Sequence, residues 1–270
     1  GEDPEVADAI DDHYKPRFQD DPLPEGMVSI TVSIAEKVDN IFGSFSVGNV
    51  PTGSQDPYAL RRQAGAILEM LINANLRCDM KGLLEQCASL YKNGADLVDK
   101  ILSFISARAN TIFTERGLRY DEIDACLSIR CYDYLELFRR AHSLHEFRKT
   151  EGFSEMLLSF KRMNNIVGAF RQKNPDYRLV FTKDALREEA EKKLFGFFDT
   201  RRGTIKEQID ANDYMSLFGI LIEGKSIIDD FFDAVMVMAE DQKLRDSRLA
   251  LLESILAPFK NLMDFSKISE

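Results

Sequence analysis

Two arginines three residues apart, Arg245 and Arg248, offer the most specific side-chain chemistry in this sequence. They stand in L-R-D-S-R-L, directly after the polar turn 240–243 and before an apolar stripe that begins at Leu249. Residues three apart share one face of a helix, and a guanidinium can stack on a planar ring or grip a base edge with two hydrogen bonds. The pair is therefore a candidate RNA contact. The structural alternative, which stays open, is that each arginine bridges an acid of the preceding helix: Asp230, Asp233 or Asp241.

Basic residues form two larger groups. The middle of the chain holds Arg139, Arg140, Lys161 and Arg162, with Arg148, Lys149, Arg171 and Lys173 beside them, and the C-terminal part holds Arg187, Lys192, Lys193, Arg201 and Arg202. Lys and Arg gathered on one face attract nucleic-acid phosphates whatever the base sequence. Pairing of these bases with acidic neighbouring helices is the alternative, and the sequence does not decide between the two.

Nucleotide and metal sites are not predicted. The segment Gly48–Ser54 has the outer spacing of a phosphate-binding loop, but Ser54 stands where that loop needs Lys, and no strand precedes it. We expect a rigid turn there. His142 and His145 have a spacing that could bind a metal, yet Arg139, Arg140 and Arg148 would repel a cation, so a solvated helix face is expected.

Composition sets limits on the partners. The net charge of -10 argues against a protein that grips nucleic acid over its whole surface, although residues 58–175 carry 18 bases and 14 acids. The four cysteines lack C-x-x-C spacing, which predicts reduced thiols in a reducing compartment. With no long apolar run and an acidic start, the chain is expected to be cytoplasmic, and its start without Met suggests a fragment of a longer protein.

Apolar residues recur at spacings of three and four, which predicts an all-α, multi-helix fold with two or three helical subdomains. The predicted helices run over residues 4–14, 27–42, 57–76, 80–92, 95–115, 120–131, 133–148, 153–172, 183–198, 203–209, 212–222, 226–241 and 246–259. Asp56 and Pro57 are expected at the N-cap and first position of the third helix. The stripes of Ile228 to Met238 and Leu249 to Met263 predict a terminal helical hairpin.

Three segments resemble the β subunit of bacterial glycyl-tRNA synthetase: 35–62 (A-E-K-V-D-N-I-F-G onward), 158–166 and 228–252. In the last, L-R-D-S-R-L departs from the family pattern only at Asp246 and Ser247, where the family commonly has Asn. The stretch Asp184–Phe195, which opens D-A-L-R, is similar to the first helix of the anticodon-binding fold that arginyl-type synthetases share.

The resemblance implies three domains. Residues 1–75 would be the end of a helical domain similar to His-Asp phosphohydrolases, 76–175 a basic helical middle region, and 176–270 an anticodon-binding domain that ends in a helical bundle. Asp39 looks like the last metal ligand of such a phosphohydrolase site, but His13 is the only His near it and the chain has no His-Asp pair. No metal is expected.

The resemblance also implies that the chain binds tRNA(Gly) and belongs to an α2β2 heterotetramer with the synthetase α subunit. ATP and glycine would bind to the α subunit, so no cofactor and no catalytic residue is expected here. Two alternatives from other classes remain: a helical protein-interaction scaffold, and a degenerate phosphohydrolase-like domain.

Overall fold

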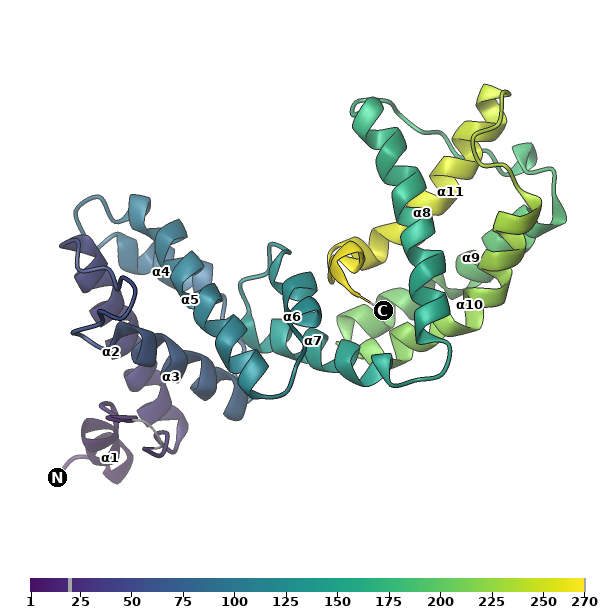
Figure 1. Cartoon of the computed structure of the whole chain (residues 1–270). Helices are drawn as coiled ribbons and strands as arrows, with labels where there is room; N and C mark the ends of the chain where they lie inside the picture. Colours follow the sequence, from purple (N-terminus) through teal and green to yellow (C-terminus); the bar gives the residue numbers. More distant parts are fainter. Residues whose placement is uncertain (19–20, 270) are drawn as a thin grey trace. The chain divides into compact units, whose positions relative to one another are not determined.

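The computed structural model describes residues 1–18 and 21–269, and over these residues the chain forms eleven α-helices and no strand (Figure 1). The all-α prediction is confirmed. The chain divides into two compact units: the N-terminal unit is Gly1–Ile123 with Arg130–Arg139, and the C-terminal unit is Asp124–Ile129 with Arg140–Glu270. The two units are defined by the contacts within each of them, and they do not test the three predicted domains. The division into 1–75, 76–175 and 176–270 therefore stays a prediction.

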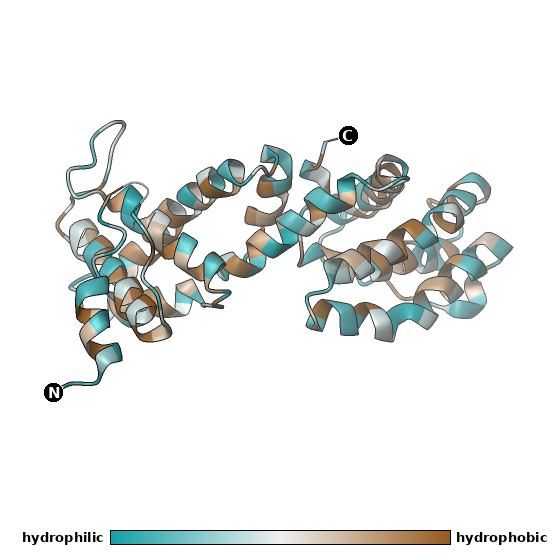
Figure 2. Ribbon diagram, turned by 90° about the horizontal axis from the view of Figure 1, so that it is seen from below, coloured by the Kyte–Doolittle hydropathy of each residue, from teal (hydrophilic) through white to brown (hydrophobic). Residues whose placement is uncertain are grey.

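The N-terminal unit contains α1 (Pro4–Asp12), α2 (Met27–Ser46), α3 (Leu60–Asn73), α4 (Met80–Ala88) and α5 (Ala95–Glu115). Helix α2 contacts α1, α3, α4 and α5, and α5 also packs on α3 and α4. The helices α6 (Tyr120–Leu127) and α7 (Tyr134–Arg148) each contribute to both units. Hydrophobic and hydrophilic residues alternate along the helices (Figure 2), and the buried residues of α2, α3 and α5 are mostly apolar.

The C-terminal unit is built on α8 (Phe153–Lys173), α9 (Glu189–Asp210), α10 (Tyr214–Ala234) and α11 (Gln242–Lys260), with single 3-10 turns at Lys183–Ala185 (η1) and Phe265–Lys267 (η2). Helix α9 lies along α10, and α8 packs on both α10 and α11 (Figure 1). The predicted terminal hairpin is wrong in its partners, because the main contacts of α11 are with α8 and α9 and not with α10.

Two predicted helix breaks are absent from the C-terminal unit. The sequence predicts breaks between the helices 183–198 and 203–209 and between the helices 212–222 and 226–241. Helix α9 continues through residues 199–202 because Leu194, Phe198 and Ile205 keep one buried face, and α10 continues through residues 223–225. Gly224 lies within α10, where an added Cβ would come within 2.8 Å of the Phe197 ring. It permits close approach of α9 and α10 and does not end the helix.

The end of α10 differs from the prediction. The helix stops at Ala234, and Val235 adopts extended dihedrals (φ -122°, ψ 118°). Val235 and Val237 are buried, whereas Met236 and Met238 are exposed, which is the two-residue alternation of an extended segment. Met238 therefore does not belong to the apolar helical stripe.

Asp56 caps α3, although it lies four residues before the first residue of the helix and not directly before it as predicted. The helix begins at Leu60, three residues after Pro57, and Ala59 before it is left-handed (φ 53°). The Asp56 carboxylate accepts hydrogen bonds from the backbone N–H of Leu60 (2.8 Å) and Arg61 (3.0 Å). The side chain thus satisfies two of the free donors at the helix start, as a capping residue does.

No helix among the described residues combines the length and apolar character that crossing a membrane requires. The four cysteines carry free thiols, and only Cys126 is fully buried. Burial raises the pKa of the Cys78 and Cys87 thiols, which keeps both protonated and unreactive at neutral pH.

Alkaline pH is expected to destabilise the N-terminal unit. Burial raises the pKa of Tyr134 to about 12, against an ordinary value near 10. Between these values the folded chain retains a proton that the unfolded chain has lost, so this contribution to stability is complete below pH 10 and disappears as the pH rises towards 12. The upper limit of the loss is about 3 kcal/mol.

Chemical denaturation at about pH 9.5 and about pH 11.5 measures this loss. Tyr134→Phe should have a shallower decline, while Tyr58→Phe, whose side chain is exposed, should follow the parent chain. Equal declines in all three proteins would contradict the assignment to Tyr134.

Candidate RNA-binding surface

Arg248 is a buried structural residue. It is 5% exposed, and its guanidinium donates to the carboxylate of Glu191, which is fully buried, and to the carbonyl of Met236 at 2.7 Å. The other oxygen of Glu191 accepts from the backbone N–H of Arg187 (2.6 Å) and Glu188 (2.8 Å), which closes a capping box at the start of α9. The ion pair therefore joins the N-terminal turns of α9 and α11, and no base can stack on this guanidinium without breaking it.

The same corner holds Arg187 at the surface. Its guanidinium contacts the carboxylate of Asp241 at 2.7 Å, and both side chains are about half exposed or more. Asp241 is also the N-cap of α11: hydrogen bonding from the backbone N–H of Leu244, followed by the nearby Arg187, holds the pKa of the Asp241 carboxyl below its usual value. Asp241, one of the three acids considered as partners of Arg245 and Arg248, thus pairs with Arg187.

Lys192 and Lys193 lie on the exposed side of the first turns of α9. Lys192 forms an ion pair with Glu189 at 2.8 Å, and this hydrogen bond raises the pKa of its ammonium. Lys193 is also exposed. Surface pairs of this kind contribute little to stability, so both ammonium groups can be redirected to a phosphate at small cost.

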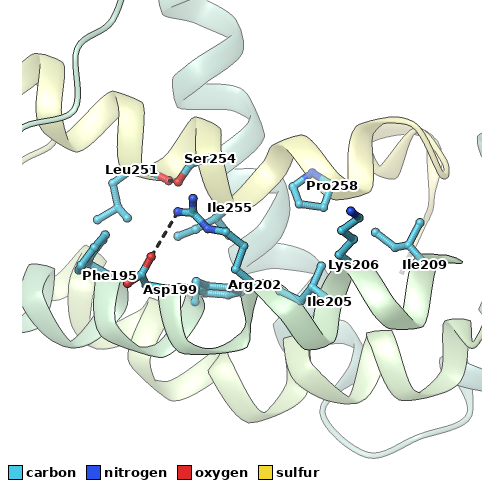
Figure 3. Close-up of a pocket in the computed structure, with 11 residues that line it drawn as sticks. Phe195, Asp199, Arg202, Ile205, Lys206, Ile209, Leu251, Ser254, Ile255 and Pro258 are labelled. Atoms are coloured by element: carbon cyan, nitrogen blue, oxygen red, sulfur yellow. Dashed lines mark hydrogen bonds and ion pairs between the residues drawn. The ribbon is translucent and has the colours of Figure 1, made fainter.

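A pocket of about 230 Å³ lies between α9 and α11, and we call it the α9–α11 pocket (Figure 3). Its walls are mostly apolar, and Asp199, Arg202 and Lys206 lie at its edge. Arg202 is highly exposed and 3.4 Å from Asp199. Arg201, on the preceding position, instead lies over the ring of Phe197 at 3.8 Å and contacts Glu223 at 3.2 Å. The two arginines therefore face different surroundings.

A larger cleft, which we call the α8 cleft, lies between the C-terminal end of α8 and the segment that joins α10 to α11. Its volume is about 700 Å³. It is lined by Asn165, Ile166, Ala169, Phe170, Lys173, Asn174, Tyr177, Met238, Gln242 and Arg245. Arg245 is half-buried and donates to the carbonyl of Ala239 at 3.3 Å. It lines this cleft, and Arg248 does not.

Hydrogen bonds of Arg171 hold one wall of the α8 cleft in place. Arg171 forms two hydrogen bonds to Glu253 (2.7 and 2.5 Å) and a third to the backbone carbonyl of Tyr177 at 2.5 Å. The Arg171 guanidinium holds the pKa of the Glu253 carboxyl below its usual value. These contacts fix the segment after α8 against α11, so the cleft has a rigid wall before any ligand arrives.

The four basic residues predicted in the middle of the chain have different partners. Arg139 belongs to the N-terminal unit and donates to the Asn75 side chain at 2.5 Å. Arg140 belongs to the C-terminal unit and donates to the carbonyl of Asn261 at 3.0 Å. Lys161 donates to the carbonyl of Ile268 at 2.6 Å, and Arg162 lies over the Phe232 ring at 4.2 Å. The first three of these side chains hold backbone or loops in place, and Arg162 keeps an exposed guanidinium.

The residues considered for metal binding have other partners. Asp39 lies in α2 and accepts a hydrogen bond from the Tyr91 hydroxyl at 2.6 Å, and His13 Nδ1 is 2.7 Å from the carbonyl of Ile10. The segment Gly48–Ser54 forms a turn after α2 with a single bridge between Thr52 and Gln55. Over residues 1–18 and 21–269 no group of three His, Cys, Asp or Glu side chains is placed to hold a metal ion.

The sequence did not single out Phe170, Tyr177 and Gln242 as site residues. The turn N-P-D-Y-R was recognised as a boundary, but an aromatic residue in a boundary turn carries no functional signal by itself. These three residues line one cleft only because residues 165–177 and 238–245 meet in the folded C-terminal unit.

Comparison with known proteins identifies two families along the chain. Residues 1–128 match the family described as glycyl-tRNA synthetase beta subunit, and residues 156–269 match the DALR anticodon binding domain. Curated proteins named glycine–tRNA ligase beta subunit are similar over 99% of the chain: that of Syntrophomonas wolfei is 38% identical, that of Desulforamulus reducens 36% and that of Clostridioides difficile 35%. The chain spans 39% of the length of each of these relatives. By these matches, residues 1–128 belong to the family described as glycyl-tRNA synthetase beta subunit and residues 156–269 to the DALR anticodon binding domain family.

Proposed function

We propose that this chain is a tRNA-binding part of the β subunit of glycine–tRNA ligase, and that it reads the anticodon of tRNA(Gly) through its C-terminal unit. The observation that carries the proposal is the match of residues 156–269 to an anticodon-binding domain, because these residues are most of that compact unit. Unpaired anticodon bases can be splayed out and read by side-chain edges and stacking. A rigid helical unit with one braced cleft suits this task.

Phosphate contacts are assigned to the exposed bases of the same unit: Arg162, Arg187, Lys192, Lys193 and Arg202. Since the whole chain carries a net charge of -10, attraction to RNA must be local, and the buried Arg248 takes no part in it. Arg139, Arg140 and Lys161, which hold backbone or loops, are positioning residues in this proposal.

Catalysis is assigned to a separate α subunit, within an α2β2 assembly in the cytoplasm. ATP and glycine would bind there, and this chain would hold the tRNA so that its acceptor end reaches that site. Binding energy spent far from the reacting ester can then orient the reacting groups. Glycine-dependent pyrophosphate exchange by the pure chain would overturn this assignment.

Binding to glycine tRNA is expected to weaken steeply with salt, because each neutralised phosphate releases counterions. A filter-binding titration from about 50 mM to about 200 mM salt measures the slope. Lys193→Ala should reduce the slope by about one unit, as the loss of one phosphate contact does.

Lys92→Ala is the matched control, since Lys92 is an exposed lysine of the N-terminal unit. Absence of binding to glycine tRNA at low salt would refute the proposed function and favour a protein-interaction scaffold.

A further inference from the structure

The α8 cleft is the best candidate for a specific ligand among the cavities of the described chain. Its volume of about 700 Å³ lies within the range of small-molecule sites, roughly 300–1,000 Å³, whereas the α9–α11 pocket at about 230 Å³ falls below it. A third cavity, in the N-terminal unit, has three arginines in its lining but also four carboxylates. It therefore offers no preference for an anion.

Charge in the α8 cleft favours an anionic ligand with an apolar face. Its lining contains two cations, Lys173 and Arg245, and no carboxylate. Phe170 and Ile166 supply apolar surface, and Met238, which is 53% exposed, extends it at the opening. A planar base attached to a phosphate has this combination of properties, since aromatic and apolar side chains take the base while Lys and Arg take the phosphate.

Hydrogen bonding behind the cleft fixes the orientation of two amide side chains. Asp246 can only accept, so the Tyr177 hydroxyl donates to it at 2.7 Å. The hydroxyl oxygen must then accept from Gln242, whose Nε2 lies 2.7 Å away, and the Oε1 of Gln242 is left as an acceptor. Asn174 likewise donates through Nδ2 to the carbonyl of Phe170 at 3.0 Å, which leaves its Oδ1 as an acceptor.

We propose that the α8 cleft binds one unstacked base that carries an exocyclic amino group. The amino group would donate to the oriented oxygens of Gln242 and Asn174, and Arg245 would donate to the acceptors on the same base edge. Cytosine fits, and uracil does not, because its O4 presents an acceptor to those two oxygens. This inference rests on the proposed function, and it names the subsite and the residues through which the anticodon would be read.

The test measures binding of the 270-residue chain to a glycine tRNA transcript and to transcripts in which single anticodon cytosines are changed to uridine. The parent chain should prefer cytosine at one position by about tenfold or more, as expected for one well-placed base contact. Gln242→Leu should narrow that preference severalfold. Tyr177→Phe, which removes the hydroxyl that orients Gln242, should narrow it as well while the chain stays folded.

Gln172→Leu is the matched control, because Gln172 is an exposed glutamine of α8 that does not line the cleft. It should leave the preference for cytosine unchanged. Lys206→Ala tests the α9–α11 pocket as the alternative location.

A fluorescence measurement reports occupancy of the cleft directly. The chain has no tryptophan, so Met238→Trp introduces the only indole at the opening of the cleft. Addition of the glycine transcript should quench its emission, and the uridine transcript that binds least well should quench it less. Leu158→Trp, at an exposed position of α8 outside the cleft, should respond little.

The outcomes separate this inference from the proposed function. If the chain binds glycine tRNA and prefers cytosine, but Gln242→Leu and Tyr177→Phe keep the full preference, the cleft assignment is overturned while the proposed function stands. If Lys206→Ala is the only variant that loses the preference for cytosine, the assignment to the α8 cleft is also overturned and the proposed function stands. If the parent chain binds no tRNA, both are overturned.

Discussion

Replacement of Arg248 by alanine is expected to lower the free energy of unfolding of the C-terminal unit by about 3–5 kcal/mol. The change leaves the carboxylate of Glu191, which is fully buried, without its guanidinium partner, and the carbonyl of Met236 loses its donor. Breaking a buried ion pair from one side is costly because the remaining charge has neither water nor a counter-ion. Thermal and chemical denaturation of the purified variant measure the loss.

Three comparisons identify the cause. Arg187→Ala removes an arginine of the same corner whose pair with Asp241 is exposed, and it should cost at most about 1 kcal/mol. Arg248→Met combined with Glu191→Met should recover part of the loss, because no buried charge remains, although the capping bonds of Glu191 to the backbone are lost. A stable Arg248→Ala variant with impaired tRNA binding would contradict this structural role and return Arg248 to the RNA-reading surface.

Replacement of Phe160 by alanine is expected to cost about 3–5 kcal/mol, through a cavity in the apolar core. Phe160 is 3% exposed in α8, and its ring lies 5.4 Å from that of Phe259 in α11 and 4.5 Å from that of Phe265 in η2. The three rings hold α11 and the C-terminal turn against α8. Their loss should therefore loosen the whole face that bears the α8 cleft, and the midpoint of chemical denaturation should fall.

Leu158→Ala provides the matched control, because Leu158 lies two residues away on α8 and is 51% exposed. Its cost should stay within about 0.5 kcal/mol, as for surface substitutions in general. Similar losses in the two variants would contradict the assignment of the loss to the aromatic cluster.

The sequence predicted a helix correctly wherever apolar residues recurred without interruption at spacings of three and four. The prediction of 95–115 coincides with α5, and that of 153–172 with α8 to within one residue. The predicted helix boundaries were wrong within α9, within α10 and at residues 235–238. Breaks were predicted between residues 198 and 203 and between residues 222 and 226, but the buried faces of α9 and α10 continue across them. Tertiary packing there offsets the low helix propensity of Gly203 and Gly224.

The identity of the family was also contained in the sequence, since L-R-D-S-R-L and the segments 35–62 and 158–166 are local patterns. Residue type and spacing further indicated that Arg245 and Arg248 would share a neighbourhood. Spacing alone could not show which of them is buried. That depends on Glu191, which lies 57 positions from Arg248 in the sequence and approaches it only when α9 and α11 pack together.

The α8 cleft was decided by the tertiary structure for the same reason. Its walls come from residues 165–177 and 238–245, and the amide of Gln242 is oriented by Tyr177, 65 positions away. A sequence determines which side chains can donate or accept, because that is a property of residue type. The direction in which each one points, and the water that it excludes, depend on neighbours brought together by folding.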